Sequence, residues 1–449
     1  MRIRLLISIA LLLVVSRLMA DDWPQFRGPR RDGVSTEKGL LKKWPEKGPK
    51  LVWSFKDAGL GFSSMAIVGD KLYTLGTDLG EKNEVVLCLD AAKGTKLWTV
   101  EIGPIFTSES NKQWGDGPRS TPTIDGERLY ALGGQGILVC LDIAAAEPKE
   151  LWRKDFKKEL DGVMMDSNDA KEGQGCWGYS ESPLVDGKLL ICTPGGPKGT
   201  VAALDKMTGA VVWRSTELNH DAPYTSVMPA VIQGVKQYIQ CSFFAKNSEC
   251  YVSGFSALDG KVLWSHMIVP KFVIYDLAPT PIVHGNLIYQ TTWHSCHLLE
   301  IDAGMKVKDL YPEKIQKTLT NNHGGVVKVG DHVYGRGMRG WVCQAFKTGK
   351  QSWEEDGMDV IGQKSASLIG ADGMLYLFSD RGEVGLAEAD AKEFTLMSEF
   401  KIPQRSKYIK GPEARLTSQS SGAWAYPVIA NGRLYLRDGE LIFCYDIRK

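Results

Sequence analysis

The chain has 449 residues, of which 43% are hydrophobic and 24% are charged, with 48 Gly and 20 Pro. This balance is typical of a globular protein and excludes a disordered or collagen-like chain. The 54 Lys and Arg residues nearly equal the 53 Asp and Glu residues, so the sequence lacks the basic excess typical of nucleic-acid-binding proteins.

Residues 1–20 have the layout of a secretory signal peptide. Arg2 and Arg4 form a basic start, a mostly apolar run of eleven residues follows, and the small Ala20 precedes an acidic pair. The run is too short to span a bilayer, which takes about 20 apolar residues. No other stretch approaches that length. We therefore expect a periplasmic or secreted protein without a transmembrane segment.

A hairpin signal recurs eight times along the rest of the chain. Each copy has an apolar segment, a turn with Gly, and a second apolar segment that mostly ends in Tyr. Asp-Gly and Asn-Gly favour tight turns because both central residues tolerate positive φ. The copies begin at Ile67, Ile124, Val185, Ile232, Val283, Val329, Ala371 and Ala430.

A second element follows most of these hairpins. It is an apolar segment ending in Leu-Asp, a short turn with Gly, and a segment ending in Trp. The clearest copies run from Leu89 to Trp98 and from Leu204 to Trp213. Each unit therefore holds four short strands in roughly 40–60 residues, as expected for one blade of a β-propeller.

The two ends of the chain predict how the ring closes. The last unit, which begins at Ala430, has no segment ending in Trp, whereas Pro49 to Trp53 supplies one before the first hairpin. We therefore predict an all-β, eight-bladed β-propeller of four-stranded blades over residues 48–449, closed by the N-terminal strand pairing into the last blade. Residues 21–47 are expected to form an extended lead-in packed on one face.

At least six Trp residues end the last strand of a unit, and this periodicity indicates packing between neighbouring blades. They are Trp53, Trp98, Trp152, Trp213, Trp264 and Trp353.

The same reasoning applies to four of the nine cysteines. Cys88, Cys140, Cys343 and Cys444 occupy equivalent positions on separate units. We expect them to be small core residues instead of disulfide partners. The loop Ser242–Glu249 lies between Cys241 and Cys250, which are candidates for a disulfide in an exported protein.

The repeat from Leu204 to Trp213 resembles the tryptophan-docking repeat of the pyrroloquinoline-quinone (PQQ) β-propellers. That superfamily holds quinoprotein dehydrogenases and also non-catalytic proteins such as the outer-membrane assembly factor BamB. The lead-in from Asp22 to Pro29 is similar to the opening of a group of exported bacterial PQQ-like repeat proteins. The resemblance covers nearly the whole chain after residue 20.

Quinone catalysis in this superfamily implies three further features. A planar cofactor stacks on an aromatic floor, oxygen ligands hold a Ca²⁺ ion, and a carboxylate accepts a proton from the alcohol. Many members also have two adjacent Cys residues. This chain has no Cys-Cys dipeptide and no Cys-x-x-Cys-His haem motif, which counts against catalysis. We therefore favour a protein with no catalytic residue, no metal and no cofactor.

Positions just before the first strand of each blade are expected to gather at one end of the central funnel. Aromatic and charged side chains there could stack on and anchor a flat polar ligand or a peptide. The alternative is that they merely fill and solvate the funnel. These candidates are Trp114, Arg119, Trp177, Tyr179, Tyr224, Asp276, His323, Lys364 and Trp424.

Two other motifs do not support a site. His294 and His297 are three residues apart, so on a strand their side chains point to opposite faces and make a poor metal site. His323 is followed by two Gly residues but has no Ser or Cys nucleophile nearby in the sequence. Its glycines are expected to permit close backbone approach near the axis.

We therefore expect an exported PQQ-like propeller that acts as a non-catalytic binding or assembly scaffold for a protein, peptide or glycan. The alternative is a PQQ- and calcium-dependent alcohol or sugar dehydrogenase. It would use Trp177 or Trp424 as a stacking floor, Arg119 or Lys364 against the quinone oxygens, and Asp276 as the base. A hydrolase or lyase on the propeller is a third class.

Overall fold

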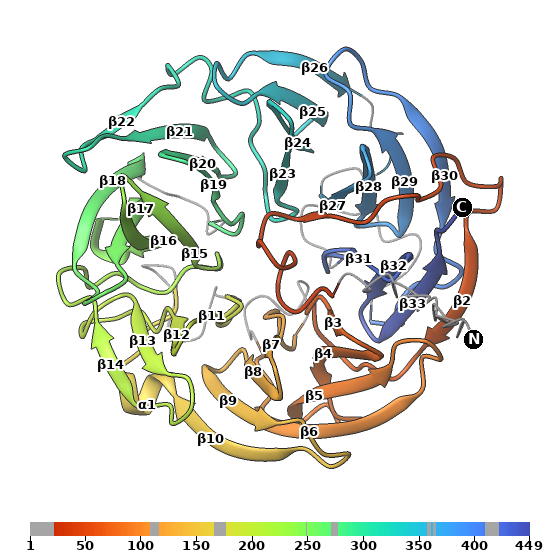
Figure 1. Cartoon of the computed structure of the whole chain (residues 1–449), viewed down its shortest axis with the longest axis horizontal. Coiled ribbons are helices and arrows are strands. Elements are labelled where there is room, and N and C mark those ends of the chain that lie inside the picture. The colour runs from red at the N-terminus through yellow and green to blue at the C-terminus, as the bar shows by residue number, and fades with distance from the viewer. Residues whose placement is uncertain are drawn as a thin grey trace, which may run out of the picture.

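The computed structural model describes residues 22–107, 116–165, 177–247, 249–270, 277–356, 361, 365–408 and 422–449. The described strands form eight sheets around one axis (Figure 1). Seven sheets have four strands and one has five. The predicted eight-bladed all-β propeller is confirmed.

Blades 1–4 contain antiparallel strands that follow one another from the axis outwards (Figure 1). Blade 1 contains β3 (Ala66–Val68), β4 (Lys71–Thr77), β5 (Asn83–Asp90) and β6 (Lys96–Pro104). Blade 2 contains β7 (Thr123–Asp125), β8 (Arg128–Leu132), β9 (Ile137–Asp142) and β10 (Lys149–Asp155). Blade 3 contains β11 (Leu184–Asp186), β12 (Leu189–Cys192), β13 (Ala202–Asp205) and β14 (Val211–Arg214). Blade 4 contains β15 (Met228–Ile232), β16 (Val235–Phe244), β17 (Glu249–Ser256) and β18 (Val262–Pro270).

Blades 5–8 repeat this order, with additions from the N-terminal segment in the last two. Blade 5 contains β19 (Ile282–His284), β20 (Leu287–Thr291), β21 (Cys296–Ile301) and β22 (Val307–Asp309). Blade 6 contains β23 (Val326–Val329), β24 (His332–Arg336), β25 (Gly340–Ala345) and β26 (Gln351–Asp356). Blade 7 contains β27 (Ala366–Ala371), β28 (Met374–Ser379), β29 (Glu383–Glu388), β30 (Leu396–Lys401) and the added β1 (Val34–Ser35). Blade 8 contains β31 (Val428–Ala430), β32 (Arg433–Asp438), β33 (Leu441–Asp446) and β2 (Lys50–Phe55).

Helices are a minor component of the described residues. The α-helix α1 (Phe156–Leu160) follows blade 2, and a single 3₁₀ turn, η2 (Ala245–Asn247), lies between β16 and β17. In the described ranges, which start at residue 22, no helix is long and apolar enough to cross a membrane. The predicted signal peptide of residues 1–20 lies outside these ranges.

The N-terminal strand closes the ring as predicted. Strand β2 pairs antiparallel with β33, and Trp53 lies opposite Cys444. The outer strand of blade 8 thus comes from the beginning of the chain, while its three inner strands come from the end. This pairing joins the beginning of the chain to its last blade by backbone hydrogen bonds.

The repeated Trp residues pack between neighbouring blades, as their periodicity predicted. The indole N–H of Trp53 in blade 8 donates to the carbonyl of Ala91 in blade 1, at 3.0 Å. The Trp152 indole of blade 2 donates to Lys206 of blade 3, at 3.2 Å. A Cβ on Gly209, whose φ is +72°, would lie 2.8 Å from the Trp152 ring. Glycine is therefore needed in this turn because the ring of the preceding blade lies against it.

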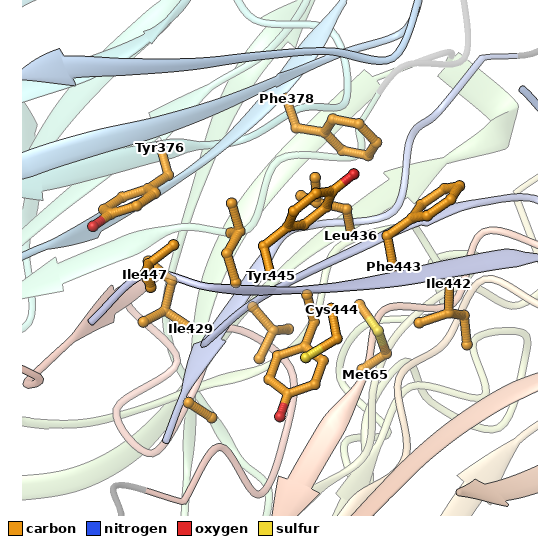
Figure 2. Packing of buried hydrophobic residues seen from close by; sticks show 14 of the residues in the cluster. Met65, Tyr376, Phe378, Ile429, Leu436, Ile442, Phe443, Cys444, Tyr445 and Ile447 are labelled. Atoms are coloured by element: carbon orange, nitrogen blue, oxygen red, sulfur yellow. The ribbon is translucent and has the colours of Figure 1, made fainter. Parts of the chain in front are cut away.

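The largest hydrophobic cluster joins blades 7, 8 and 1 to the lead-in residues Trp23, Leu40 and Trp44. Figure 2 shows how β33 contributes to it: Tyr445 and Phe443 point to one side of the strand, and Cys444 and Ile442 to the other. This alternation follows from the two-residue period of a strand. Each face of the blade is therefore covered by its neighbour.

The cysteines described by the structure are all buried free thiols. Cys88, Cys140, Cys343 and Cys444 lie within separate blades, which confirms their predicted core role. Cys241 on β16 and Cys250 on β17 are also free. The candidate disulfide between them is therefore not formed, because Cys241 pairs with Val252 across the two strands and not with Cys250.

The lead-in crosses the axis and contacts six of the eight blades (Figure 1). It pairs with blade 1 through a bridge between Trp23 and Ile67 and with blade 7 through the parallel pairing of β1 with β27. Backbone or side-chain hydrogen bonds also join it to blades 2, 3, 6 and 8. These contacts lie mainly near the hairpin turns of the innermost strands, so we call this end of the axis the turn end.

Candidate functional site

The opposite end of the axis, where the innermost strands begin, carries the predicted funnel residues; we call it the entry end. The loops there approach one another across several blades. The residues described at this end are Phe62, Arg119, Trp177, Tyr224, His323, Ser365 and Trp424, each preceding the innermost strand of its blade. Trp114, Asp276 and Lys364, which sequence reasoning also selected, lie outside the described residues.

Five side chains from blades 1, 2, 6, 7 and 8 form one group, which we call the axial cluster: Phe62, Arg119, His323, Ser365 and Trp424. The rings of Phe62 and Trp424 have centroids 5.2 Å apart. His323 meets Trp424 edge to face at 4.6 Å. Because blades 6 and 8 are not neighbours, the contact between His323 and Trp424 places both side chains close to the axis.

Arg119 is the cation of the axial cluster. Its guanidinium carbon lies 5.0 Å from the ring centroid of Phe62 and 5.8 Å from that of Phe106. Its Nη1 donates to the carbonyl of Gly117 at 2.9 Å. The side chain is half-buried. Aromatic faces attract a guanidinium through their quadrupole, so these rings hold the charge in position at the entry end.

Glu84 is a buried carboxylate within electrostatic reach of Arg119. Its oxygens accept hydrogen bonds from the backbone N–H groups of Phe106, at 3.1 Å, and Gly134, at 2.8 Å. Burial raises the pKa of Glu84 to about 7, although both hydrogen bonds and the charge of Arg119 act in the opposite direction. Since both oxygens already accept backbone hydrogen bonds, this carboxyl group anchors the loops of blades 1 and 2.

His323 has a nucleophile-type neighbour that the sequence did not reveal. Ser365 Oγ of blade 7 lies 2.9 Å from His323 Nε2, which corrects the expectation that no such group is near. Burial, and secondly the charge of Arg119, lower the pKa of His323 to about 4. The imidazole is therefore neutral at pH 7, and the imidazolium that would form if it accepted a proton as a general base is disfavoured. The pair fits a polar wall of the site better than a catalytic dyad.

Tyr426 connects the axial cluster to the lead-in beneath it. Its hydroxyl donates to the carbonyl of His323 at 2.9 Å. Its ring meets Phe26 edge to face at 5.2 Å, and the guanidinium of Arg27 lies 5.7 Å from its centroid. The lead-in therefore packs against Tyr426, which in turn holds His323 of the axial cluster.

The remaining described candidates lie elsewhere. Trp177 and Tyr224 form a second aromatic pair between blades 3 and 4, with centroids 5.5 Å apart. Tyr179 does not face the funnel, which corrects that prediction: it is only 1% exposed, packs against Phe156, and donates its hydroxyl to the carbonyl of Pro194 at 3.0 Å. It belongs to the core because Gly136 opposite leaves space for its ring.

The described residues do not fit a calcium–quinone centre. Among them, no three His, Cys, Asp or Glu side chains are grouped closely enough to hold a metal ion. Arg119 also places a positive charge at the entry end, where it would repel a divalent cation. Glu84 is occupied by backbone donors. We therefore derive no chemical step through such a group.

Sequence reasoning missed Phe62, Phe106 and Tyr426. Phe62 follows the rule that selected the other candidates, since it precedes the first hairpin at Ile67. Tyr426 follows it too, since it lies two residues before β31. Phe106 has no such signal, because neither the repeat nor its immediate sequence shows that it contacts Arg119.

Solved structures with the same fold include both scaffolds and enzymes. BamB from Moraxella catarrhalis is 14% identical, with 89% of this chain and 99% of that chain covered and a TM-score of 0.57. A europium-containing methanol dehydrogenase is 12% identical, with 93% and 90% covered and a TM-score of 0.60. The quinohemoprotein alcohol dehydrogenase from Comamonas testosteroni is 12% identical, with 96% and 81% covered and a TM-score of 0.59. At these identities, the similarity shows the fold alone.

Sequence comparison is more specific about the family. No curated protein matches the chain. The family model described as outer membrane protein assembly factor BamB matches residues 82–354, which is more than half of the chain. This range runs from blade 1 to blade 6 and so includes most of the repeats. The chain therefore belongs to the BamB-like family of PQQ-type propellers.

Proposed function

We propose that this protein is an exported, non-catalytic scaffold that holds a segment of another protein at its entry end. Membership of the BamB-like family supports a protein partner, since BamB is an assembly factor. Export rests on the signal-peptide layout of residues 1–20. The axial cluster is the site where we place the partner.

The observation that carries this proposal is the chemistry of the axial cluster. Arg119 is a half-buried cation resting on Phe62 and Phe106, and Trp424 beside it adds a large aromatic surface. His323 adds no charge at neutral pH because its pKa is lowered to about 4. One cation surrounded by aromatic rings suits an acidic or aromatic side chain, because each could pair with the guanidinium or stack on the rings.

A PQQ-dependent dehydrogenase is the second candidate. The observation in its favour is that Trp424 and Arg119, which could face a quinone ring and its oxygens, lie in one cluster with Phe62. Among the described residues, no three His, Cys, Asp or Glu side chains form a group that could hold a metal ion. The scaffold proposal needs only the contacts that the axial cluster already makes.

Site-directed photo-cross-linking tests the scaffold proposal. A photoreactive amino acid replaces Phe62 at the entry end, and a matched control replaces Leu258, an 86% exposed residue on blade 4. We expect cross-links to a defined protein partner from position 62 and not from position 258. Arg119→Ala should reduce the yield from position 62 at least about tenfold, as for the loss of a charged anchor.

Equal cross-linking from positions 62 and 258, or an unchanged yield with Arg119→Ala, would overturn the proposal. The same protein, incubated with chitooligosaccharides, shows whether a glycan competes for the site. Binding of the glycan by a protein that forms no cross-link to any partner would also overturn it.

A further inference from the structure

The lead-in places two arginine side chains inside the axis of the propeller. Arg27 is 4% exposed and Arg31 is 1% exposed. Both have left-handed backbone conformations, with φ of 60° and 55°. Such conformations are costly for residues other than glycine and persist only where surrounding contacts determine them. The fold therefore holds both guanidinium groups at fixed positions away from solvent.

Arg31 is surrounded by neutral acceptors. Its Nη2 donates to the carbonyl of Ser182 at 2.7 Å, and its Nη1 donates to Gln25 Oε1 at 3.0 Å and to the carbonyl of Pro183 at 3.2 Å. Its buried Nε has no acceptor among the described residues. Since a guanidinium group is donor-only, this N–H requires an acceptor that the described residues do not supply.

Arg27 repeats this arrangement on the other side of the axis. Its Nη2 donates to the carbonyls of Asp32, at 2.9 Å, and Val326, at 2.5 Å. Its Nη1 is buried, and the Arg27 side chain also hydrogen-bonds to the Tyr426 hydroxyl. A Cβ on Gly325 would lie 2.7 Å from this Nη1, so the glycine leaves the space that the guanidinium fills.

Glu181 is the acidic group near Arg31, and it does not complete the pairing. Its Oε1 accepts from the backbone N–H of Thr193, and its Oε2 accepts from Gln240 Nε2 at 3.4 Å. Glu181 acts electrostatically on Arg31 without accepting a hydrogen bond from it. The charge of Arg27 also acts on Arg31 and lowers its pKa, which indicates that the two cations lie within electrostatic reach of each other.

Two hydroxyl groups of blade 2 contribute further unpaired donors. Thr121 Oγ1 and Ser120 Oγ are buried and have no hydrogen-bond partner in the part of the chain that the structure describes. Thr121 N–H donates to Ser182 Oγ at 2.9 Å, while the carbonyl of the same Ser182 accepts from Arg31. The contacts of Thr121 and Arg31 therefore converge on one residue of blade 3.

From this surplus of buried donors and positive charge, we propose that the axis binds a small inorganic anion of the halide class next to Arg31, Arg27 and Thr121. An anion supplies acceptors for several donors at once and balances the second guanidinium charge. Buried charges are normally paired and buried polar groups hydrogen-bonded. The anion would thereby link the lead-in to blade 2. A water molecule could satisfy the donors but not the charge.

The test measures thermal unfolding of the whole protein in sodium chloride, sodium bromide or sodium gluconate at one fixed ionic strength. A ligand that binds only the folded state raises the midpoint as its concentration increases. We expect the midpoint temperature of unfolding to be higher in chloride or bromide than in gluconate. Crystals grown in bromide should show an anomalous peak beside Arg31.

Two variants assign the effect to this site. Thr121→Val keeps the side-chain shape but removes the hydroxyl, and it should reduce the halide-dependent shift by at least half. Arg30→Gln changes an exposed arginine on the same segment, and it should leave the shift unchanged. Equal midpoints in chloride and gluconate, or a crystal in which only water occupies the axis, would overturn the proposal. Loss of partner cross-linking from position 62 alone would not affect it.

Discussion

Two arginines in the axis have opposite surroundings. Arg31 of the lead-in is almost fully buried and donates to backbone carbonyls, so it holds the lead-in against the ring. Arg119 of blade 2 is half-buried and lies on the rings of Phe62 and Phe106 at the entry end. Burial among carbonyls serves stability, whereas a half-buried cation on aromatic rings suits contact with a partner. The comparison therefore separates a structural arginine from the arginine at which we propose that a partner binds.

The largest expected effect is the loss of stability on removal of Arg31. Arg31→Ala removes a side chain that links the lead-in to blade 3 and leaves the buried Ser182 carbonyl without its donor, while the Pro183 carbonyl keeps the Thr123 hydroxyl. We expect the free energy of unfolding to fall by about 2–4 kcal/mol, as for other losses of buried polar partners. Urea denaturation measures this. The exposed neighbour Arg30→Ala should cost less than about 1 kcal/mol, and equal losses would contradict the assigned roles.

A smaller effect is expected from closing the space that Arg27 occupies. In Gly325→Ala, the new Cβ would lie 2.6 Å from the Tyr426 hydroxyl and 2.7 Å from Arg27 Nη1, at a φ of +68°. We expect a loss of about 1–3 kcal/mol from overlap and backbone strain. The control is Gly126→Ala, which has φ of +58° but open space around it. If both variants lose the same stability, the overlap with Arg27 contributes nothing.

The pH dependence of stability should report the buried Glu181. Burial raises the pKa of this group from 4.5 to about 7 in the folded protein. The folded state therefore binds the proton more tightly than the unfolded state, and stability decreases as pH rises from about 4.5 to about 7. Glu181→Gln should reduce this decrease by roughly 1–3 kcal/mol. An identical pH profile in the variant would show that Glu181 is not buried as described.

The smallest expected effect on stability is at the entry end. Arg119→Ala should lower the free energy of unfolding by less than about 1 kcal/mol, because a half-buried cation on aromatic rings contributes little to folding. It should nevertheless abolish most partner cross-linking from position 62. A loss comparable to that of Arg31→Ala would mean that both arginines are structural.

The periodic features of the molecule were predictable from sequence, and the contacts outside the period were not. Repeated Trp residues and the Trp53 segment predicted the blades and the closure, because each recurs at a fixed place in the repeat. The insertion of Arg31 into the axis depends on the path of the lead-in, which no repeat encodes. The contact of His323 with Ser365 likewise joins two blades. The spacing of residues within one blade therefore does not predict it.

Tyr179 shows a second limit of sequence reasoning. It was selected because it precedes an innermost strand, as Trp177 does. Neighbouring residues of a loop can point in opposite directions, and Tyr179 points into the core between blades 2 and 3. Position in the repeat predicts which end of the axis a residue approaches, but it does not predict the direction of its side chain.

The central proposal is that the entry end binds a partner and does not carry out quinone chemistry. The most direct measurement adds pyrroloquinoline quinone with Ca²⁺, and separately with a lanthanide ion, and follows alcohol-dependent reduction of a dye. Our account predicts that the protein reduces the dye no faster than the free cofactor does. This should hold with either metal and with primary alcohols or sugars as substrates. Dye reduction that requires the protein and disappears in Trp424→Ala would contradict it and identify a dehydrogenase.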